Sequence, residues 1–211
     1  MATLNSDRAQ AGWRFWLLWM GACIVGVFVY ALMIPFIVAA MNAIAPAQQA
    51  GSGAPGQTWT GVAIALIGSG TLGAVIGLAQ WLVLRRYLRG SGWWVLATAI
   101  GYAVPLALGP LFPLPQPPWL AGGMMFLLFG IVLGVLQWLV LRGRVQKAGW
   151  WVAISIVSWL AAFALIGAVI VSGLYAEPFD LYAAFLVPVA LAGAGIVWVL
   201  RRAAPVVQAT V

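Results

Sequence analysis

The chain has 211 residues, of which 65% are hydrophobic and only 6% are charged, whereas about 25% are charged in typical soluble domains. This number of charged side chains is too small to cover the surface of a soluble protein of this size. Most of the surface is therefore expected to face lipid. The net charge is +7, but the basic residues form short clusters between long apolar runs, without the basic helix or arm that tracks a phosphate backbone. This pattern argues against nucleic acid as a partner.

Six apolar runs follow one another along the chain, each near the length of about 20 residues that a helix needs to cross a bilayer. The runs are continuously apolar and do not alternate, which predicts helices and excludes barrel strands. Segments rich in glycine and proline separate them, as at 51–56 and 113–118. The sequence therefore predicts a single all-α polytopic membrane domain over 1–211 with six transmembrane helices. The expected spans are 13–37, 59–84, 93–112, 119–141, 150–173 and 181–200.

The basic residues predict how these spans are oriented. If there are six spans, every lysine and arginine falls on one side of the membrane, and the opposite loops carry Glu177 and Asp180. Loops rich in lysine and arginine stay in the cytoplasm, so both termini are expected there, in a bacterial inner membrane. The basic clusters are Arg8 with Arg14, Arg85 with Arg86 and Arg89, Arg142 with Arg144 and Lys147, and Arg201 with Arg202.

An internal repeat is the sharpest feature of the sequence. Residues 73–85 and 130–142 match at an offset of 57, and the match continues from Gly-Trp-Trp-Val at 92–95 to the same four residues at 149–152. A weaker third copy opens with Gly12-Trp13. It closes with Ala190, Ala194, Trp198 and Arg202, and Val197 replaces the glutamine. The prediction is three parallel helical hairpins, at 12–86, 92–142 and 149–202.

The repeat places two glycines and a glutamine on one helix face, at positions i, i+4 and i+7. Two glycines four residues apart let a neighbouring helix approach closely, and the glutamine amide can bond across to another helix. We expect tight helix packing at these positions. The alternative is a polar site or channel lined by the two glutamines. The residues are Gly73, Gly77 and Gln80 in one copy, and Gly130, Gly134 and Gln137 in the other.

Most tryptophans fall where an apolar run ends, which predicts an aromatic belt at the headgroup level. Trp19 and Trp159 lie deeper in their runs, and either pack in the core or line a cavity for a flat ligand. The arginines that follow the repeated spans are expected to set topology, and the basic clusters also suit anionic lipid. The predicted interface anchors are Trp81, Trp93, Trp94, Trp138, Trp150 and Trp151, together with Arg85 and Arg142.

The chain lacks the side chains that most catalytic and metal sites use. It has no histidine, and its three acidic residues, Asp7, Glu177 and Asp180, all lie outside the apolar runs. Serines within the spans have no candidate base nearby in sequence. We therefore predict no catalytic residue, no metal site and no enzymatic activity. No cofactor is predicted either, apart from bound lipid.

The Gln-Trp-Leu-Val-Leu-Arg and Gly-Trp-Trp-Val elements resemble those of uncharacterised bacterial multipass membrane proteins, over about 70–161. The resemblance implies the fold and brings no activity with it. The leading hypothesis is a non-catalytic integral membrane subunit, or an assembly or stabilising factor, of a larger inner-membrane complex. Its partners would be the lipid bilayer and other membrane protein subunits.

Two other classes of function remain open from the sequence. In size and span number the chain is similar to the substrate-binding membrane components of energy-coupling-factor transporters, although those are not built from this repeat. The third hypothesis is an accessory binder of lipid, quinone or carotenoid.

Overall fold

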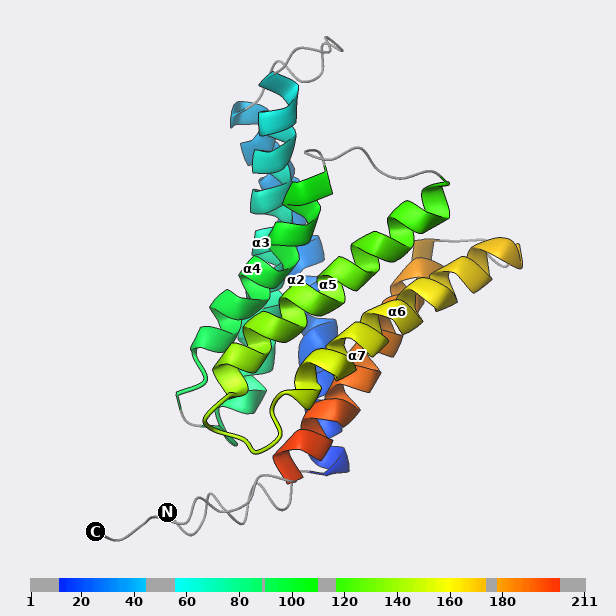
Figure 1. The fold of residues 1–211 in the computed structure, drawn as a ribbon. Coiled ribbons are helices and arrows are strands. Elements are labelled where there is room, and N and C mark those ends of the chain that lie inside the picture. The colour runs from blue at the N-terminus through cyan, green and yellow to red at the C-terminus, as the bar shows by residue number, and fades with distance from the viewer. Residues whose placement is uncertain (1–11, 45–55, 89, 110–116, 174–177, 202–211) are drawn as a thin grey trace, which may run out of the picture.

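The computed structural model describes residues 12–44, 56–88, 90–109, 117–173 and 178–201, and this part of the chain is helical, without strands (Figure 1). Helix α2 extends seven residues beyond the predicted end at 37, because Pro35 lies inside the helix without ending it. The other described helix ends lie within about four residues of the predicted ones. The helices are α2 (Trp13–Ile44), α3 (Gly56–Leu84), α4 (Trp93–Leu108), α5 (Pro118–Leu141), α6 (Trp150–Val171) and α7 (Pro178–Arg201).

Four of the described helices are long and apolar enough to cross a membrane, namely α2, α3, α5 and α6. Helix α4 has 16 residues and is therefore about 24 Å long, less than the roughly 30 Å of a bilayer core. The predicted end of the third span, 110–112, lies outside the described residues. In α7 the apolar part that qualifies is Leu186–Arg201, which is also short.

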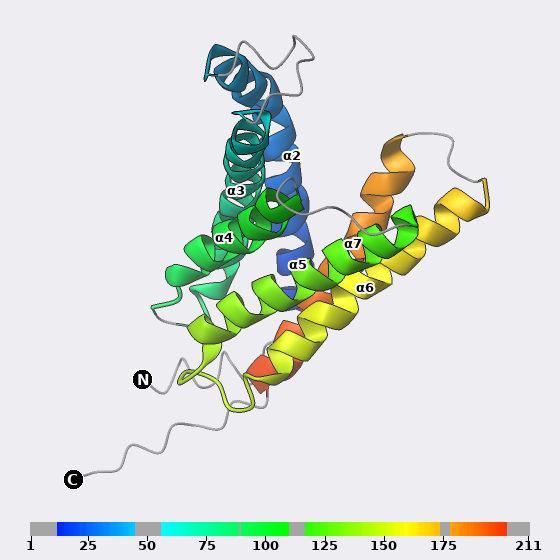
Figure 2. The same cartoon turned by 45° about the horizontal axis from the view of Figure 1, so that its top comes forward.

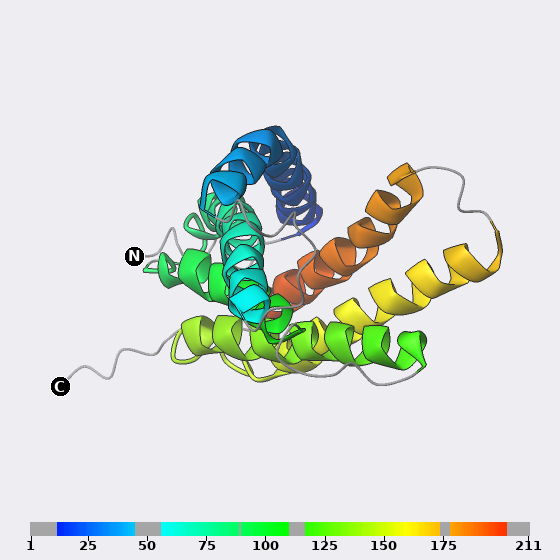
Figure 3. The same ribbon diagram turned by 90° about the horizontal axis from the view of Figure 1, so that it is seen from above.

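The six helices form a closed ring, because each packs against the next in sequence and α2 packs against α7 (Figure 3). The most extensive contacts join α3 with α4 and α5 with α6. These two pairs cross the predicted hairpin boundaries, because each joins the last helix of one predicted hairpin to the first helix of the next. The closest packing thus occurs across the short basic loops, at 85–92 and 142–149.

The helices converge at one end of the ring and spread apart at the other (Figures 1 and 2). The converging end holds the start of α2, the end of α7 and both short loops. We call it the basic end, because every cation in the described part of the chain lies there. These cations are Arg14, Arg85, Arg86, Arg142, Arg144, Lys147 and Arg201.

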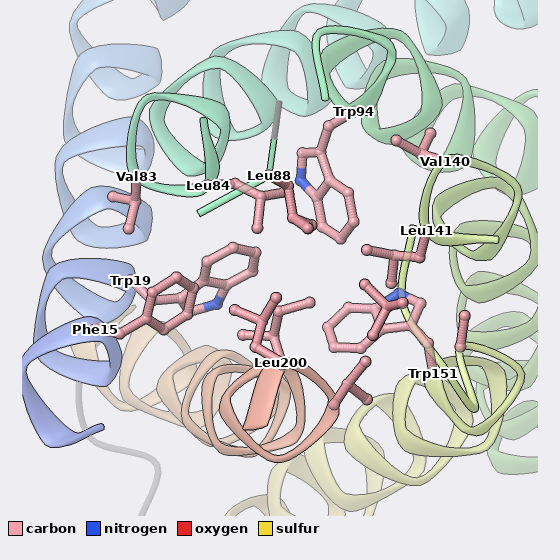
Figure 4. Close-up of a cluster of buried hydrophobic side chains, with 14 of the residues drawn as sticks. Phe15, Trp19, Val83, Leu84, Leu88, Trp94, Val140, Leu141, Trp151 and Leu200 are labelled. Carbon is pink, nitrogen blue, oxygen red and sulfur yellow. The ribbon is translucent and has the colours of Figure 1, made fainter. Parts of the chain in front are cut away.

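The main hydrophobic core also lies toward the basic end, where the helices are closest together. Trp19, Trp94 and Trp151 come from three different helices and point toward one another (Figure 4). The ring centroids of Trp94 lie 5.9 Å from those of Trp19 and 5.8 Å from those of Trp151. Three buried leucines complete this layer, and each directly precedes an arginine at a helix end: Leu84, Leu141 and Leu200.

Candidate functional site

The repeated glycines lie where α3 meets α4 and where α5 meets α6. A Cβ atom added to Gly73 would lie 2.9 Å from Ala99 Cα, and one added to Gly130 would lie 2.7 Å from Ile156 Cα. Both contacts are with backbone atoms, which cannot move aside without shifting a helix. The glycines therefore allow the close helix approach expected from their spacing.

The same helix pairs bury a repeated hydrogen bond between glutamine and tryptophan. On the α3–α4 pair, the Trp94 indole N–H donates to Gln80 Oε1 at 2.9 Å. On the α5–α6 pair, the Trp151 N–H donates to Gln137 Oε1 at 3.0 Å. All four side chains are buried. An indole N–H or an amide buried without a partner costs about 1–3 kcal/mol, so each residue stabilises the burial of the other.

The amide nitrogens of the two glutamines connect these pairs to further helices. Gln80 Nε2 donates to Cys23 Sγ on α2 at 3.3 Å. Gln137 Nε2 donates to Thr98 Oγ1 on α4 at 3.0 Å, and Thr98 in turn donates to the Trp94 carbonyl. The network thus continues from α2 through α3, α4 and α5 to α6. The amide groups of both glutamines therefore bond to other residues of the chain. This supports the expected role in helix packing over the alternative, in which the two glutamines line a polar site or channel.

Sequence reasoning did not identify Thr98 and Cys23 as members of this network. For Thr98 a signal was present, because Ser155 stands 57 residues later, so both copies carry a hydroxyl at the same position of a largely apolar helix. Both hydroxyl residues are buried against the second glycine of their helix pair, Gly77 or Gly134. For Cys23 no such signal exists.

The structure corrects the prediction that Trp94 and Trp151 are interface anchors. Their side chains are only 0% and 2% exposed, and their indole nitrogens bond to the glutamines inside the ring. The preceding tryptophans, Trp93 and Trp150, are exposed on the outside, where an anchor has to lie. Adjacent residues on a helix point about 100° apart, so one of each pair faces inward and the other outward.

The other predicted anchors, Trp81 and Trp138, lie half-buried at the ends of α3 and α5. Arg85 lies over the Trp81 ring at 5.2 Å from its centroid, and Arg142 lies over Trp138 at 5.7 Å. These are distances at which a cation and an aromatic face attract. The arrangement suits a headgroup region, where the ring contacts apolar chains and the cation contacts water.

Trp159 is a packing residue of a second, smaller aromatic cluster. Its ring stacks on Phe129 with centroids 4.9 Å apart, and Tyr102 meets it edge-on at 5.8 Å. Phe126 covers it from a further direction. Because other rings contact this side chain from several sides, the structure favours its packing role over the cavity that the sequence left open.

The contact between α7 and α2 has a spacing like that of the other two pairs, but it is much less extensive, and its glycine meets indole side chains instead of helix backbone. Gly193 approaches Trp16 and Trp19, which are three residues apart, as Gly77 approaches Val95 and Thr98. This register differs by one residue from the sequence alignment of the third copy, which matched Ala194 and Val197. In the contact register, Ile196 takes the place of Gln80, and Phe15 takes the place of Trp94. Both are 0% exposed, so two apolar residues stand where the other pairs have a glutamine and a tryptophan. The hydrogen bond between α2 and α7 is made elsewhere, by Trp16 Nε1, which donates to the Ala190 carbonyl at 3.0 Å.

The third pair leaves one buried donor without a partner. Trp19 Nε1 is buried and makes no hydrogen bond within the described structure. Its ring is nonetheless part of the main core, edge-on to Trp94 and stacked near Phe15. Trp19 therefore contributes its apolar surface, while its N–H group costs stability.

We therefore expect Trp19→Phe to destabilise the protein less than Trp94→Phe, by about 1–3 kcal/mol. Both changes remove the same volume from the same core, but only the second leaves Gln80 Oε1 without its donor. Detergent-solubilised protein unfolded with SDS, followed by far-ultraviolet circular dichroism, measures both free energies. Equal losses, or a larger loss for Trp19→Phe, would show that the Trp19 N–H has a partner.

One cation of the basic end has a structural role. Arg144 donates to the Gly90 carbonyl at 3.1 Å and also to the carbonyl of Val140. It therefore joins the two short loops and caps the last turn of α5. Within the described ranges, no three His, Cys, Asp or Glu side chains come together as metal ligands would.

The chain matches no protein-family model, no curated protein and no solved structure.

Proposed function

We propose that the protein is a non-catalytic subunit, or an assembly or stabilising factor, of a larger complex in a bacterial inner membrane. In this proposal all six helices cross the membrane, and the basic end, with both termini, faces the cytoplasm. The orientation is supported by the position of every described cation at that end, since lysine and arginine are enriched on the cytoplasmic side.

The observation that carries the proposal is the exposed second half of α2. This helix buries Phe15, Trp19, Cys23 and Gly26, all within its first half. From Val27 to Ala40 no side chain is buried, and Phe36 is 76% exposed. Figure 2 shows this part of α2 beside α3 and away from the other helices. A long apolar helix surface is thus left for lipid or for the helix of another subunit.

Pro35 favours a protein partner over lipid on this surface. Proline has no N–H group, so the carbonyl of Ala31, four residues earlier, loses its helical donor. In hydrocarbon an unpaired carbonyl is costly, and membrane helices tolerate proline where neighbouring helices or ordered water supply a donor. On the exposed half of α2, a polar side chain of a partner helix would supply it.

Site-specific photo-crosslinking in native membranes tests this proposal. A photo-reactive residue at Phe36 should give one discrete cross-linked protein, which mass spectrometry then identifies. The same residue at Val171, which is 89% exposed at the spread end of α6, serves as the control and should give lipid adducts. If Phe36 also gives only lipid adducts, and native mass spectrometry of the mildly extracted protein shows it alone, the subunit proposal is wrong.

A further inference from the structure

We propose that the protein binds one anionic phospholipid at the start of α6, with the phosphate at Lys147 and an acyl chain along the outer face of that helix. An open hollow of about 390 Å³ lies here, lined by Lys147, Gly149, Trp150 and Ala153. The proposal is independent of the partner complex proposed above, because it concerns the opposite end of the molecule.

The charge of this region favours an anion. All seven described cations lie at the basic end, and the only acidic residue in the described ranges, Asp180, is in the first turn of α7, at the other end. Lys147 is exposed in the loop between α5 and α6. The lipid phosphate would be bound by the Lys147 ammonium group, because the first backbone N–H groups of α6 already donate to carbonyls of the chain. Those of Trp150, Trp151 and Val152 donate at 3.1, 2.9 and 3.2 Å.

An apolar path leads away from the hollow, and it favours a lipid over free phosphate. On α6 the exposed residues below Trp150 follow helical spacing, with Ala153, Val157, Leu160 and Ala164 on one face. Val157, in the middle of this face, is 62% exposed. From Ala153 to Ala164 this face is about 17 Å long, close to the depth of one bilayer leaflet. A lipid with its headgroup at Lys147 would lay its chain on this face.

The matched loop of the preceding repeat carries different residues at two of the positions that line the hollow. At the offset of 57, Lys147 corresponds to Gly90, and Ala153 corresponds to Leu96. Both loop residues adopt the left-handed backbone conformation, with φ of 58° for Lys147 and 73° for Gly90. Glycine adopts this conformation without the cost that lysine has. The second loop thus has a lysine at the position where the first has a glycine. Its helix has the small Ala153 at the position where the first has the larger Leu96.

This correspondence supplies substitutions that the fold already accommodates. Lys147→Gly and Ala153→Leu give the start of α6 the residues of the start of α4. Lys147→Gln removes the charge but, unlike Lys147→Gly, does not add the conformational freedom of a glycine. Arg86→Gln is the control, because Arg86 is an exposed cation of the same end that does not line the hollow.

The experiment is native mass spectrometry of the delipidated full chain in detergent, titrated with phosphatidylglycerol or with phosphatidylcholine of the same acyl chains. We expect one phosphatidylglycerol to bind at least fivefold more tightly than phosphatidylcholine. Lys147→Gly and Lys147→Gln should each weaken phosphatidylglycerol about fivefold, the effect of roughly one cation at a membrane surface. Ala153→Leu should weaken both lipids, and Arg86→Gln should change neither by more than twofold.

Three results would overturn the proposal. Equal losses for Arg86→Gln and Lys147→Gln would show that the overall positive field, and not this hollow, attracts the lipid. Unchanged binding by Ala153→Leu would show that the hollow is not used. Displacement of the lipid by inorganic phosphate at the same concentration would show that the site takes free phosphate and that the apolar face does not contribute.

Discussion

Gly130→Ala is expected to destabilise the protein by about 1–3 kcal/mol, although alanine is the better helix former. The propensity gain on replacing a helical glycine with alanine is about 1 kcal/mol. Against it stands a new methyl group 2.7 Å from Ile156 Cα, which can be accommodated only if α5 and α6 move apart. That movement reduces contact along one of the two closest helix pairs, so the packing loss exceeds the propensity gain.

Gly167→Ala is the matched control on the other helix of the pair. Gly167 also lies inside a long helix, but an added Cβ there would meet nothing within 4 Å. We expect this change to be neutral or to stabilise by up to about 1 kcal/mol. The measurement is the SDS titration used for the tryptophan variants. If the two substitutions have the same sign, close packing at Gly130 does not limit stability.

Gln137→Ile is expected to lower the free energy of unfolding by about 2–5 kcal/mol. It leaves the buried N–H of Trp151 without its acceptor and removes the donor to Thr98 Oγ1, and each lost partner costs about 1–3 kcal/mol. The chain itself suggests the compensating change. Where α7 meets α2, Ile196 and Phe15 occupy the corresponding buried positions as an apolar pair.

The double variant Gln137→Ile with Trp151→Phe should therefore be more stable than the sum of the two single losses predicts. Replacing both partners of a buried hydrogen bond with apolar groups removes the unpaired donor and acceptor together. A double-mutant cycle gives the coupling energy, which we expect at about 1–3 kcal/mol. Additive losses would mean that Gln137 and Trp151 stabilise the fold by independent contacts and not as a pair.

The two predictions test different parts of the same interface. The contact at Gly130 brings the backbones of α5 and α6 together, and the bond between Gln137 and Trp151 lies about two helical turns further toward the basic end. In lipid, apolar surfaces gain little by contacting each other instead of acyl chains, so close backbone contact and buried hydrogen bonds carry much of the specificity of helix pairing. The recurrence of both features on α3 and α4 explains why these two pairs pack most closely.

The sequence by itself determined the helices and most of their ends. A continuous apolar run must form a helix if it lies in lipid, and segments rich in glycine and proline end such runs, so 119–141 was predicted within one residue of α5. The sequence also determined the glycine face and its glutamine, because a fixed helical spacing places Gly130, Gly134 and Gln137 together whatever the neighbours are.

Only the tertiary structure decided which residues of a helix face inward. A soluble helix shows its buried face as an apolar stripe, but these helices are apolar on nearly all sides, as expected of helices that can cross a membrane. Trp93 and Trp94 are therefore equivalent in sequence, and the rotation imposed by Gly73 and Gly77 turns only Trp94 into the core. The register of the α7–α2 contact has the same origin, because Ala194 and Gly193 are both small and only packing selects Gly193.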